Sequence, residues 1–215
     1  MLRSLASAVC ILVSLAGSAS VQSPDRLWRW TGFYVGAGLG GGAALQTQTL
    51  TDIGFGTFSE TTGAGGVLAS AIAGYDVRVS PTIVAGAFID ADISNMSNPD
   101  FGALSLPFDH RYSLSIGGRL GFLATPATLW YVTAGYTRAN FAFEILGNFD
   151  FDGVFFGAGV ETRLPGNWSL RGEYRYTQFA SEQLFDLCGC GSFDAEGTMH
   201  TGRVVLVYAL DAGAP

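Results

Sequence analysis

Alternation between apolar residues and small or polar residues runs along most of this chain. In residues 82–93, isoleucine and alanine occupy every second position from Ile83 to Ile93, while Asp90 and Asp92 belong to the other set. Successive side chains of an extended strand point to opposite faces, so a period of two predicts β-strands. The same alternation predicts eight strands, at about residues 32–43, 67–78, 82–93, 111–122, 130–136, 154–164, 168–176 and 201–210.

The two faces of these strands differ in chemistry. One face carries aliphatic and aromatic residues, and the other carries glycine and charges of both signs. A slip by one residue in the strand at 111–122 would move Arg111 and Arg119 into lipid, at about 2–4 kcal/mol each near the bilayer midplane. The pattern therefore predicts an all-β fold, an eight-stranded antiparallel up-and-down transmembrane β-barrel with lipid outside. A soluble lipocalin-like barrel, with the apolar face inside, is the alternative fold.

The composition favours the membrane. Charged residues make up 13% of the 215 positions, whereas soluble domains average about 25%. After the first 20 residues, no run approaches the roughly 18–20 uncharged residues that a membrane helix needs. Strands that span a bilayer must pair all their backbone groups, so the predicted sheet has to close on itself.

The chain divides into four predicted segments. Arg3, an apolar stretch at residues 8–16 and small residues at 17–19 are typical of a secretory signal. The segments are a signal peptide (1–20), a periplasmic N-terminal segment (21–31), the outer-membrane β-barrel (32–210) and a C-terminal tail (211–215). Export followed by a β-barrel predicts the outer membrane of a Gram-negative cell.

The connections alternate in length. Short turns are predicted near Ser80, Thr125 and Gly166, and long loops at about residues 45–64, 94–108, 142–150 and 180–197. Short periplasmic turns and long outer loops are the outer-membrane pattern, which puts both termini in the periplasm. Aromatic residues at the periplasmic strand ends predict an interfacial girdle of Trp28, Trp30, Trp130, Trp168 and Tyr208.

Two segments carry a family resemblance. Residues 30–36 (WTGFYVG) and 167–176 (NWSLRGEYRY) resemble the small eight-stranded OmpA-like and opacity-like outer-membrane proteins, often described as porin-family surface antigens. The resemblance extends over residues 129–134 and 155–160, and it implies a barrel inserted by the barrel-assembly machinery, without catalytic residues. Such proteins usually finish on an aromatic residue, whereas this sequence continues past Tyr208 and Leu210.

The inward set of the predicted strands is rich in charge. Every basic residue of the chain is arginine, whose planar fork binds two carboxylate oxygens at once. Eight strands leave an interior that side chains can fill, so these charges are predicted to form a polar plug. A narrow gated ion path through the same charges is the alternative. The predicted lumen network consists of Asp90, Asp92, Arg111, Arg119, Glu161, Arg163, Arg171, Glu173, Arg175 and Arg203.

The predicted outer loops hold the other candidate sites. Cys188 and Cys190 are predicted to be an oxidised structural pair, and a vicinal disulfide, a bridge to another chain and a metal pair all remain open. His110 and His200 lie near outer strand ends, where a lipid A-modifying enzyme would use them with Ser105 or Glu196.

The charge of the loops bears on partners. Their excess of carboxylates disfavours nucleic acid. It leaves lipopolysaccharide, through bridging cations, and a surface ligand as expected partners beside the membrane lipid.

The sequence therefore predicts an outer-membrane β-barrel protein with a structural, surface-exposed role and at most a narrow pore. No catalytic, cofactor-binding or metal-binding residues are predicted. A small-solute or ion channel is the first alternative, and a lipid A-modifying enzyme is the second.

Overall fold

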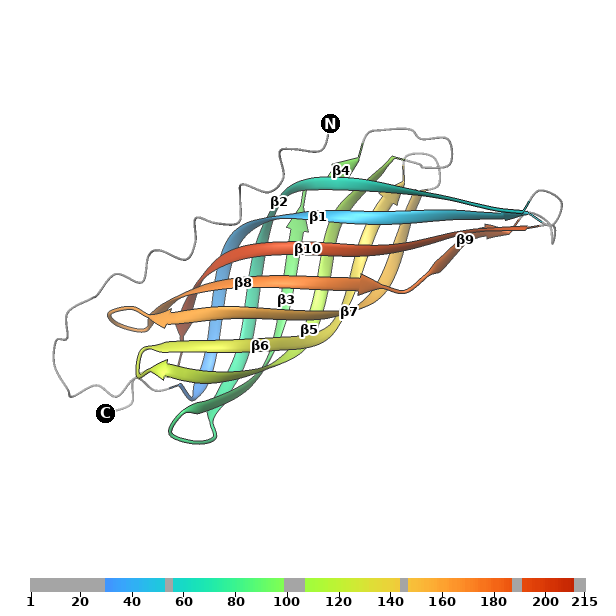
Figure 1. The fold of residues 1–215 in the computed structure, drawn as a ribbon. Coiled ribbons are helices and arrows are strands. Elements are labelled where there is room, and N and C mark those ends of the chain that lie inside the picture. The colour runs from blue at the N-terminus through green and yellow to red at the C-terminus, as the bar shows by residue number, and fades with distance from the viewer. Residues whose placement is uncertain (1–29, 53–55, 99–106, 144–146, 187–190, 211–215) are drawn as a thin grey trace, which may run out of the picture.

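Eight long strands follow one another around a closed antiparallel ring in the computed structural model, which describes residues 30–52, 56–98, 107–143, 147–186 and 191–210 (Figure 1). Each strand pairs with the next along the ring, and β1 closes it by pairing with both β2 and β10. The ring strands are β1 (Gly32–Asp52), β2 (Gly56–Arg78), β3 (Ile83–Ser94), β5 (Phe108–Thr125), β6 (Thr128–Phe143), β7 (Gly147–Arg163), β8 (Trp168–Phe179) and β10 (Gly191–Ala209). Two short strands, β4 (Ser97–Asn98) and β9 (Glu182–Asp186), pair outside this ring order. The predicted all-β antiparallel barrel is confirmed.

The outer surface of the ring is apolar. Large aliphatic and aromatic side chains are exposed there, including Leu39, Ile116 and Trp130, which are 72%, 59% and 62% exposed. Arginines and carboxylates such as Arg119, Glu161 and Arg171 are buried in the interior. A water-soluble barrel would reverse this arrangement, so the lipocalin-like alternative is wrong. No helix among the described residues is long and apolar enough to span a membrane.

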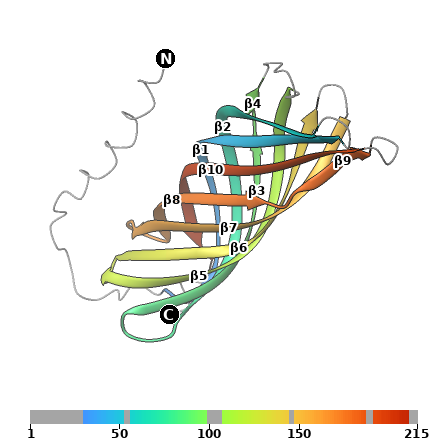
Figure 2. The same cartoon turned by 45° about the vertical axis from the view of Figure 1, so that its right-hand side comes forward.

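The short connections all lie at one end of the barrel (Figures 1 and 2). Between β2 and β3, the hydroxyl of Ser80 accepts the backbone N–H of Ile83 at 3.1 Å. The β7–β8 turn contains Gly166 with a φ of 80°, a left-handed conformation that glycine adopts without a steric cost. Residues 30 and 210 lie at this same end, where the Leu210 N–H donates to the Phe33 carbonyl at 2.8 Å.

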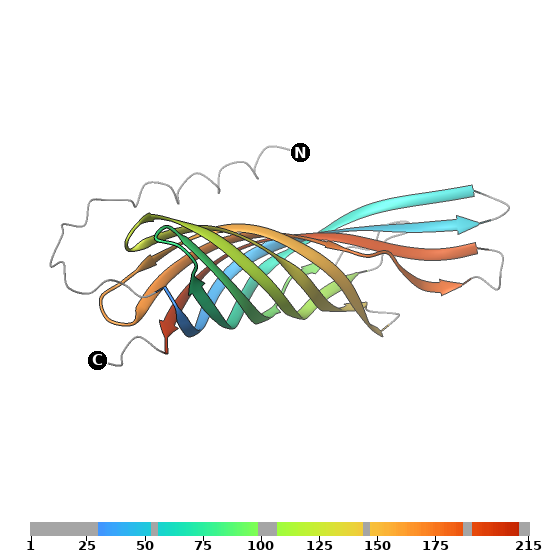
Figure 3. The same ribbon diagram turned by 90° about the horizontal axis from the view of Figure 1, so that it is seen from below.

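At the opposite end, strands continue into segments that were predicted to be long loops. A strand needs about 9–11 residues to cross a bilayer, whereas β1 has 21 residues and β2 has 23. The prediction of a loop over residues 45–64 is wrong, since β1 and β2 remain paired as far as Asp52 and Gly56. Figure 3 shows β2, β1, β10 and β9 projecting together beyond the ring.

Threonine explains why this extension stays in register. Thr47 and Thr49 lie on one face of β1, and their hydroxyls contact those of Thr61 (2.8 Å) and Ser59 (3.0 Å) on β2. β-Branched residues and cross-strand threonine pairs favour a sheet over an irregular loop. The hairpin therefore continues after the apolar alternation has ended.

Candidate functional site

The interior of the barrel holds two connected ionic clusters. In the first, Glu161 on β7 accepts hydrogen bonds from Arg119 on β5 (Nη1, 2.7 Å) and from Arg171 on β8 (Nη2, 2.8 Å; Nε, 3.0 Å). Arg119 also donates from Nε to Asp76 on β2 at 2.9 Å. Glu161 and Arg171 are each 1% exposed. This cluster, the Glu161 cluster, therefore joins four strands through groups that water does not reach.

The second cluster, the Asp90 cluster, lies on β3, β8 and β10. Asp90 accepts from Nη2 of Arg175 (2.7 Å) and from Nη2 of Arg203 (3.0 Å). Arg203 also binds Glu173 at 2.7 Å and Asp92 at 3.1 Å. Charge-assisted hydrogen bonds of this kind are the strong ones, and here each guanidinium bridges two or more carboxylates.

Aromatic rings connect and cover the charges. The Tyr131 hydroxyl donates to Glu173 at 2.8 Å, and the guanidinium carbon of Arg119 lies 5.2 Å from the centre of the Tyr131 ring. Arg175 stacks over Phe155 at 4.0 Å. A planar guanidinium can stack on a ring and hydrogen-bond at its edge, so arginine suits this crowded interior better than lysine.

Most of the predicted lumen residues lie in these two clusters. Asp90, Asp92, Arg119, Glu161, Arg171, Glu173, Arg175 and Arg203 are all buried and joined by hydrogen bonds. Arg163 is half-buried at the short-turn end, with its guanidinium 4.4 Å from the centre of the Trp30 ring. Asp76 was not among the predicted network residues. It lies between Tyr75 and Val77, which were predicted to face outward, so the alternation places the Asp76 side chain in the lumen.

The structure corrects the prediction for Arg111. Register shifts between His110 and Tyr112, so that Arg111 has no partner residue on β6. His110 is buried, while Arg111 and Tyr112 are both exposed on the outer surface. A β-bulge adds one residue to a strand and re-aims the side chains that follow. Arg111 therefore lies outside the barrel, because the bulge interrupts the alternation that placed it in the lumen.

The structure also corrects the prediction for Trp30. Its side chain is 1% exposed, inside the short-turn end of the barrel, and its indole N–H donates to the Pro126 carbonyl at 3.0 Å. Gly32, the first residue of β1, has a φ of 142°, which favours glycine. Trp130 and Trp168 are exposed on the outer surface, and Tyr208 packs against Trp168 with ring centres 4.8 Å apart. Trp28 lies outside the described residues.

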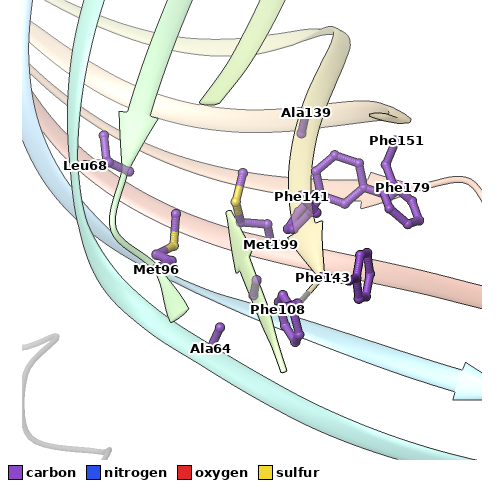
Figure 4. Close-up of a cluster of buried hydrophobic side chains, with 11 residues drawn as sticks. Ala64, Leu68, Met96, Phe108, Ala139, Phe141, Phe143, Phe151, Phe179 and Met199 are labelled. Carbon is purple, nitrogen blue, oxygen red and sulfur yellow. The ribbon is translucent and has the colours of Figure 1, made fainter. Parts of the chain in front are cut away.

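Apolar layers cover the ionic clusters at both ends. At the short-turn end, Trp30 packs with Val84, Leu123, Leu129 and Tyr131. At the hairpin end, a second layer fills the interior (Figure 4). This layer consists of Ala44, Ala64, Leu68, Met96, Phe108, Ala139, Phe141, Phe143, Phe151, Phe179 and Met199, all buried. Side chains thus occupy the lumen from one end to the other.

The two histidines lie on opposite faces of the wall. His110 is buried in the lumen, where its Nδ1 lies 2.7 Å from the hydroxyl of Ser94. His200 contacts the Tyr174 hydroxyl at 2.6 Å on the outer surface. Glu196 is four residues before His200 on the same strand, roughly 13 Å away along it. Among the described residues, neither histidine therefore has the serine–carboxylate arrangement of a hydrolase.

Several predicted features cannot be placed. Ser105, Cys188, Cys190, the signal peptide and the C-terminal tail lie outside the described residues. Within the part of the chain that the structure describes, no group of three or more histidine, cysteine, aspartate or glutamate side chains is arranged to hold a metal ion.

Known proteins resemble this chain over most of its length. Residues 9–206 match the family described as outer membrane protein beta-barrel domain. The 31 kDa outer-membrane immunogenic protein of Brucella melitensis biotype 1 is 27% identical over 215 residues, covering 89% of this chain and 88% of the relative. The protein of the same name from Brucella suis biovar 1 has the same identity and coverage. Neisserial surface protein A is a similar solved structure, with 16% identity, a TM-score of 0.41, and coverage of 81% of this chain and 97% of that one.

Proposed function

The chain belongs to the outer membrane protein β-barrel domain family, and from this premise we propose that it is a closed barrel that does not conduct. Its role is structural: it occupies the outer membrane, holds its long hairpins at the cell surface and presents them there as an antigen. The barrel-assembly machinery inserts it, and both termini face the periplasm.

The observation that carries the proposal is the filled lumen. The two ionic clusters bind their charges to one another, so an ion entering the barrel would have to break buried ion pairs. Removing one partner of a buried ion pair costs about 3–5 kcal/mol, and the layers at the two ends consist mainly of apolar side chains, which do not replace the hydration of an ion. A channel needs a path on which binding is weak enough for the ion to leave.

The enzyme alternative has less support. Nucleophilic catalysis needs a base within hydrogen-bond reach of the nucleophile and a third group that orients the base. Ser94 and His110 supply the first contact, but the hydroxyl also lies 3.1 Å from the His110 carbonyl, and no described carboxylate contacts the imidazole. We infer that the protein is not an enzyme. Its acidic outer hairpins also disfavour nucleic acid as a partner.

Planar-bilayer recording tests the closed barrel. We expect no unitary current steps from the folded wild-type protein, with heat-modifiable gel mobility as the check on folding and a general porin as the check on detection. Phe141→Ala, which thins the apolar layer at the hairpin end, is expected to stay silent too, because the ionic clusters still block the lumen. Regular steps from the wild type that change their ion selectivity in Glu173→Gln would establish the channel instead.

Cysteine labelling in intact cells tests the orientation. Thr57→Cys lies in the long β1–β2 hairpin and Thr82→Cys in the short β2–β3 turn, both at exposed positions. In a Cys188→Ser/Cys190→Ser background, a bulky impermeant maleimide should label only the first in intact cells and both after lysis. Labelling of Thr82→Cys alone in intact cells would show that the barrel has the opposite orientation in the membrane.

A further inference from the structure

Two arginines face outward near the hairpin end of the barrel. Arg111 is turned out by the β5 bulge, and Arg138 lies on the neighbouring strand β6 with its side chain 58% exposed. Tyr112 pairs with Asn140, and Leu114 pairs with Arg138. Arg111 precedes Tyr112 and therefore lies near Asn140 on the neighbouring strand. Arg138 is two residues from Asn140, roughly 7 Å along the strand, so the long side chains of Arg111 and Arg138 can contact the same ligand. Among the described residues, no other arginine faces outward at this end.

Their neighbours place them at the membrane interface. Tyr112 and Tyr136 are exposed on the same surface, and tyrosine favours the headgroup level of a bilayer. An arginine on the lipid-facing surface costs about 2–4 kcal/mol at the midplane but only about 0–1 near the interface. On the outer side of an outer membrane, the groups found at that level are the sugars and phosphates of lipopolysaccharide.

Both guanidinium groups are available to a ligand. Arg111 forms no ion pair with any described residue, and Asp109, two positions further out, does not pair with it. Arg138 donates to Asp150 from Nη2 at 3.1 Å and from Nε at 3.3 Å, and its Nε lies 4.0 Å from Asp152, but exposed ion pairs of this kind are worth about 0–1 kcal/mol each. Asn140 also donates to Asp150, at 2.7 Å, and the Tyr136 hydroxyl donates to Asp152. The two carboxylates therefore keep a donor when Arg138 turns to a ligand.

We propose that Arg111 and Arg138 form a binding site for the phosphates of the lipid A headgroup. The proposal deepens the function proposed above, since it requires the hairpin end to face the outer leaflet. A guanidinium binds phosphate through two parallel N–H donors, with more directional contact than an ammonium offers. The bulge places Arg111 on the lipid-facing surface instead of in the lumen, and it leaves the register of the rest of β5 unchanged.

Titration of the detergent-folded protein with bis-phosphorylated lipid A tests the site. The double variant Arg111→Gln/Arg138→Gln should bind about tenfold more weakly or worse, since charged hydrogen bonds are lost. Arg78→Gln is the matched control, because Arg78 is an exposed arginine at the other end that bonds the turn carbonyls of Ser80 and Pro81. Its affinity should equal that of the wild type.

Ligand variants separate a headgroup from free phosphate. Wild-type protein should bind dephosphorylated lipid A about as weakly as the double variant binds the phosphorylated form, and inorganic phosphate at equal concentration should not compete. Equal affinity for both lipids, unchanged affinity in a double variant with normal heat-modifiable mobility, or competition by inorganic phosphate would each overturn the site. A conducting barrel that still loses lipid A binding in the double variant would overturn only the closed-barrel proposal.

Discussion

Glu161→Gln is expected to destabilise the folded barrel by about 3–5 kcal/mol, a large fraction of the roughly 5–15 kcal/mol by which folded proteins are stable. Glutamine keeps the shape of the side chain and removes its charge. Arg119 retains Asp76, but Arg171 has no other ion-pair partner among the described residues and becomes an unpaired buried cation. Urea unfolding in phospholipid vesicles, followed by tryptophan fluorescence, measures the loss.

Two further variants separate charge from packing in this experiment. Asp150→Asn removes one partner of an exposed pair and should cost less than about 1 kcal/mol. Glu161→Gln/Arg171→Met removes the orphaned cation as well, so it should recover much of the lost stability, because apolar replacement of a buried pair is often neutral. If the double variant is less stable than Glu161→Gln, the Arg171 side chain stabilises the barrel through its shape and ring contacts, and the electrostatic explanation fails.

Alternation alone predicts which side chains of most strands face the lumen. Asp90, Glu173 and Arg203 could be assigned to the interior because their strands show unbroken alternation through the membrane-spanning part. Parity also identifies Asp76, whose neighbours Tyr75 and Val77 lie on the outer face. Following the alternation of side chains along β2 therefore predicts from the sequence that Asp76 belongs to the lumen network.

The alternation along β1 predicts the burial of Trp30 better than its place at the end of a strand does. A tryptophan at the end of a strand favours the interface in general, which led to the girdle prediction. Trp30 nevertheless has the same parity as Tyr34, which lies in the lumen. Gly32 separates the two residues with a φ of 142°, and the Trp30 indole donates to the Pro126 carbonyl inside the barrel. Burial of a large aromatic surface outweighs the weaker preference for the interface.

The bulge in β5 and the ends of the long hairpins could not be predicted from the alternation of apolar and polar residues. Nothing in the residues around Arg111 distinguishes a bulged arginine from one inside the barrel, because both keep the adjacent tyrosine outside. The hairpin strands beyond the membrane have polar residues on both faces, so apolar alternation ends where the lipid ends, although hydrogen bonding continues. The threonines at positions 47, 49 and 61 are the remaining signal for strand there.

Ile116→Arg is expected to destabilise the barrel by about 2–4 kcal/mol in phospholipid vesicles, because the new guanidinium would face acyl chains near the midplane. Ile116 is 59% exposed at the middle of the apolar stretch of β5. Tyr112→Arg, four residues nearer the hairpin end and 44% exposed on the same surface, should cost only about 0–1 kcal/mol. Urea midpoints of the two variants and the wild type, at equal lipid composition, measure the difference.

This pair of variants also gives the depth of the bulge in the membrane. Arg111 is adjacent to Tyr112, so a small loss at position 112 and a large one at 116 would place Arg111 among the headgroups, where the lipid A site requires it. Equal and large losses of stability would show that both positions lie in the hydrocarbon. Arg111 would then be an unpaired charge among acyl chains, and the lipid A site would be wrong. Equal and negligible losses would mean that water surrounds the apolar surface, and the membrane orientation of the barrel would then be wrong.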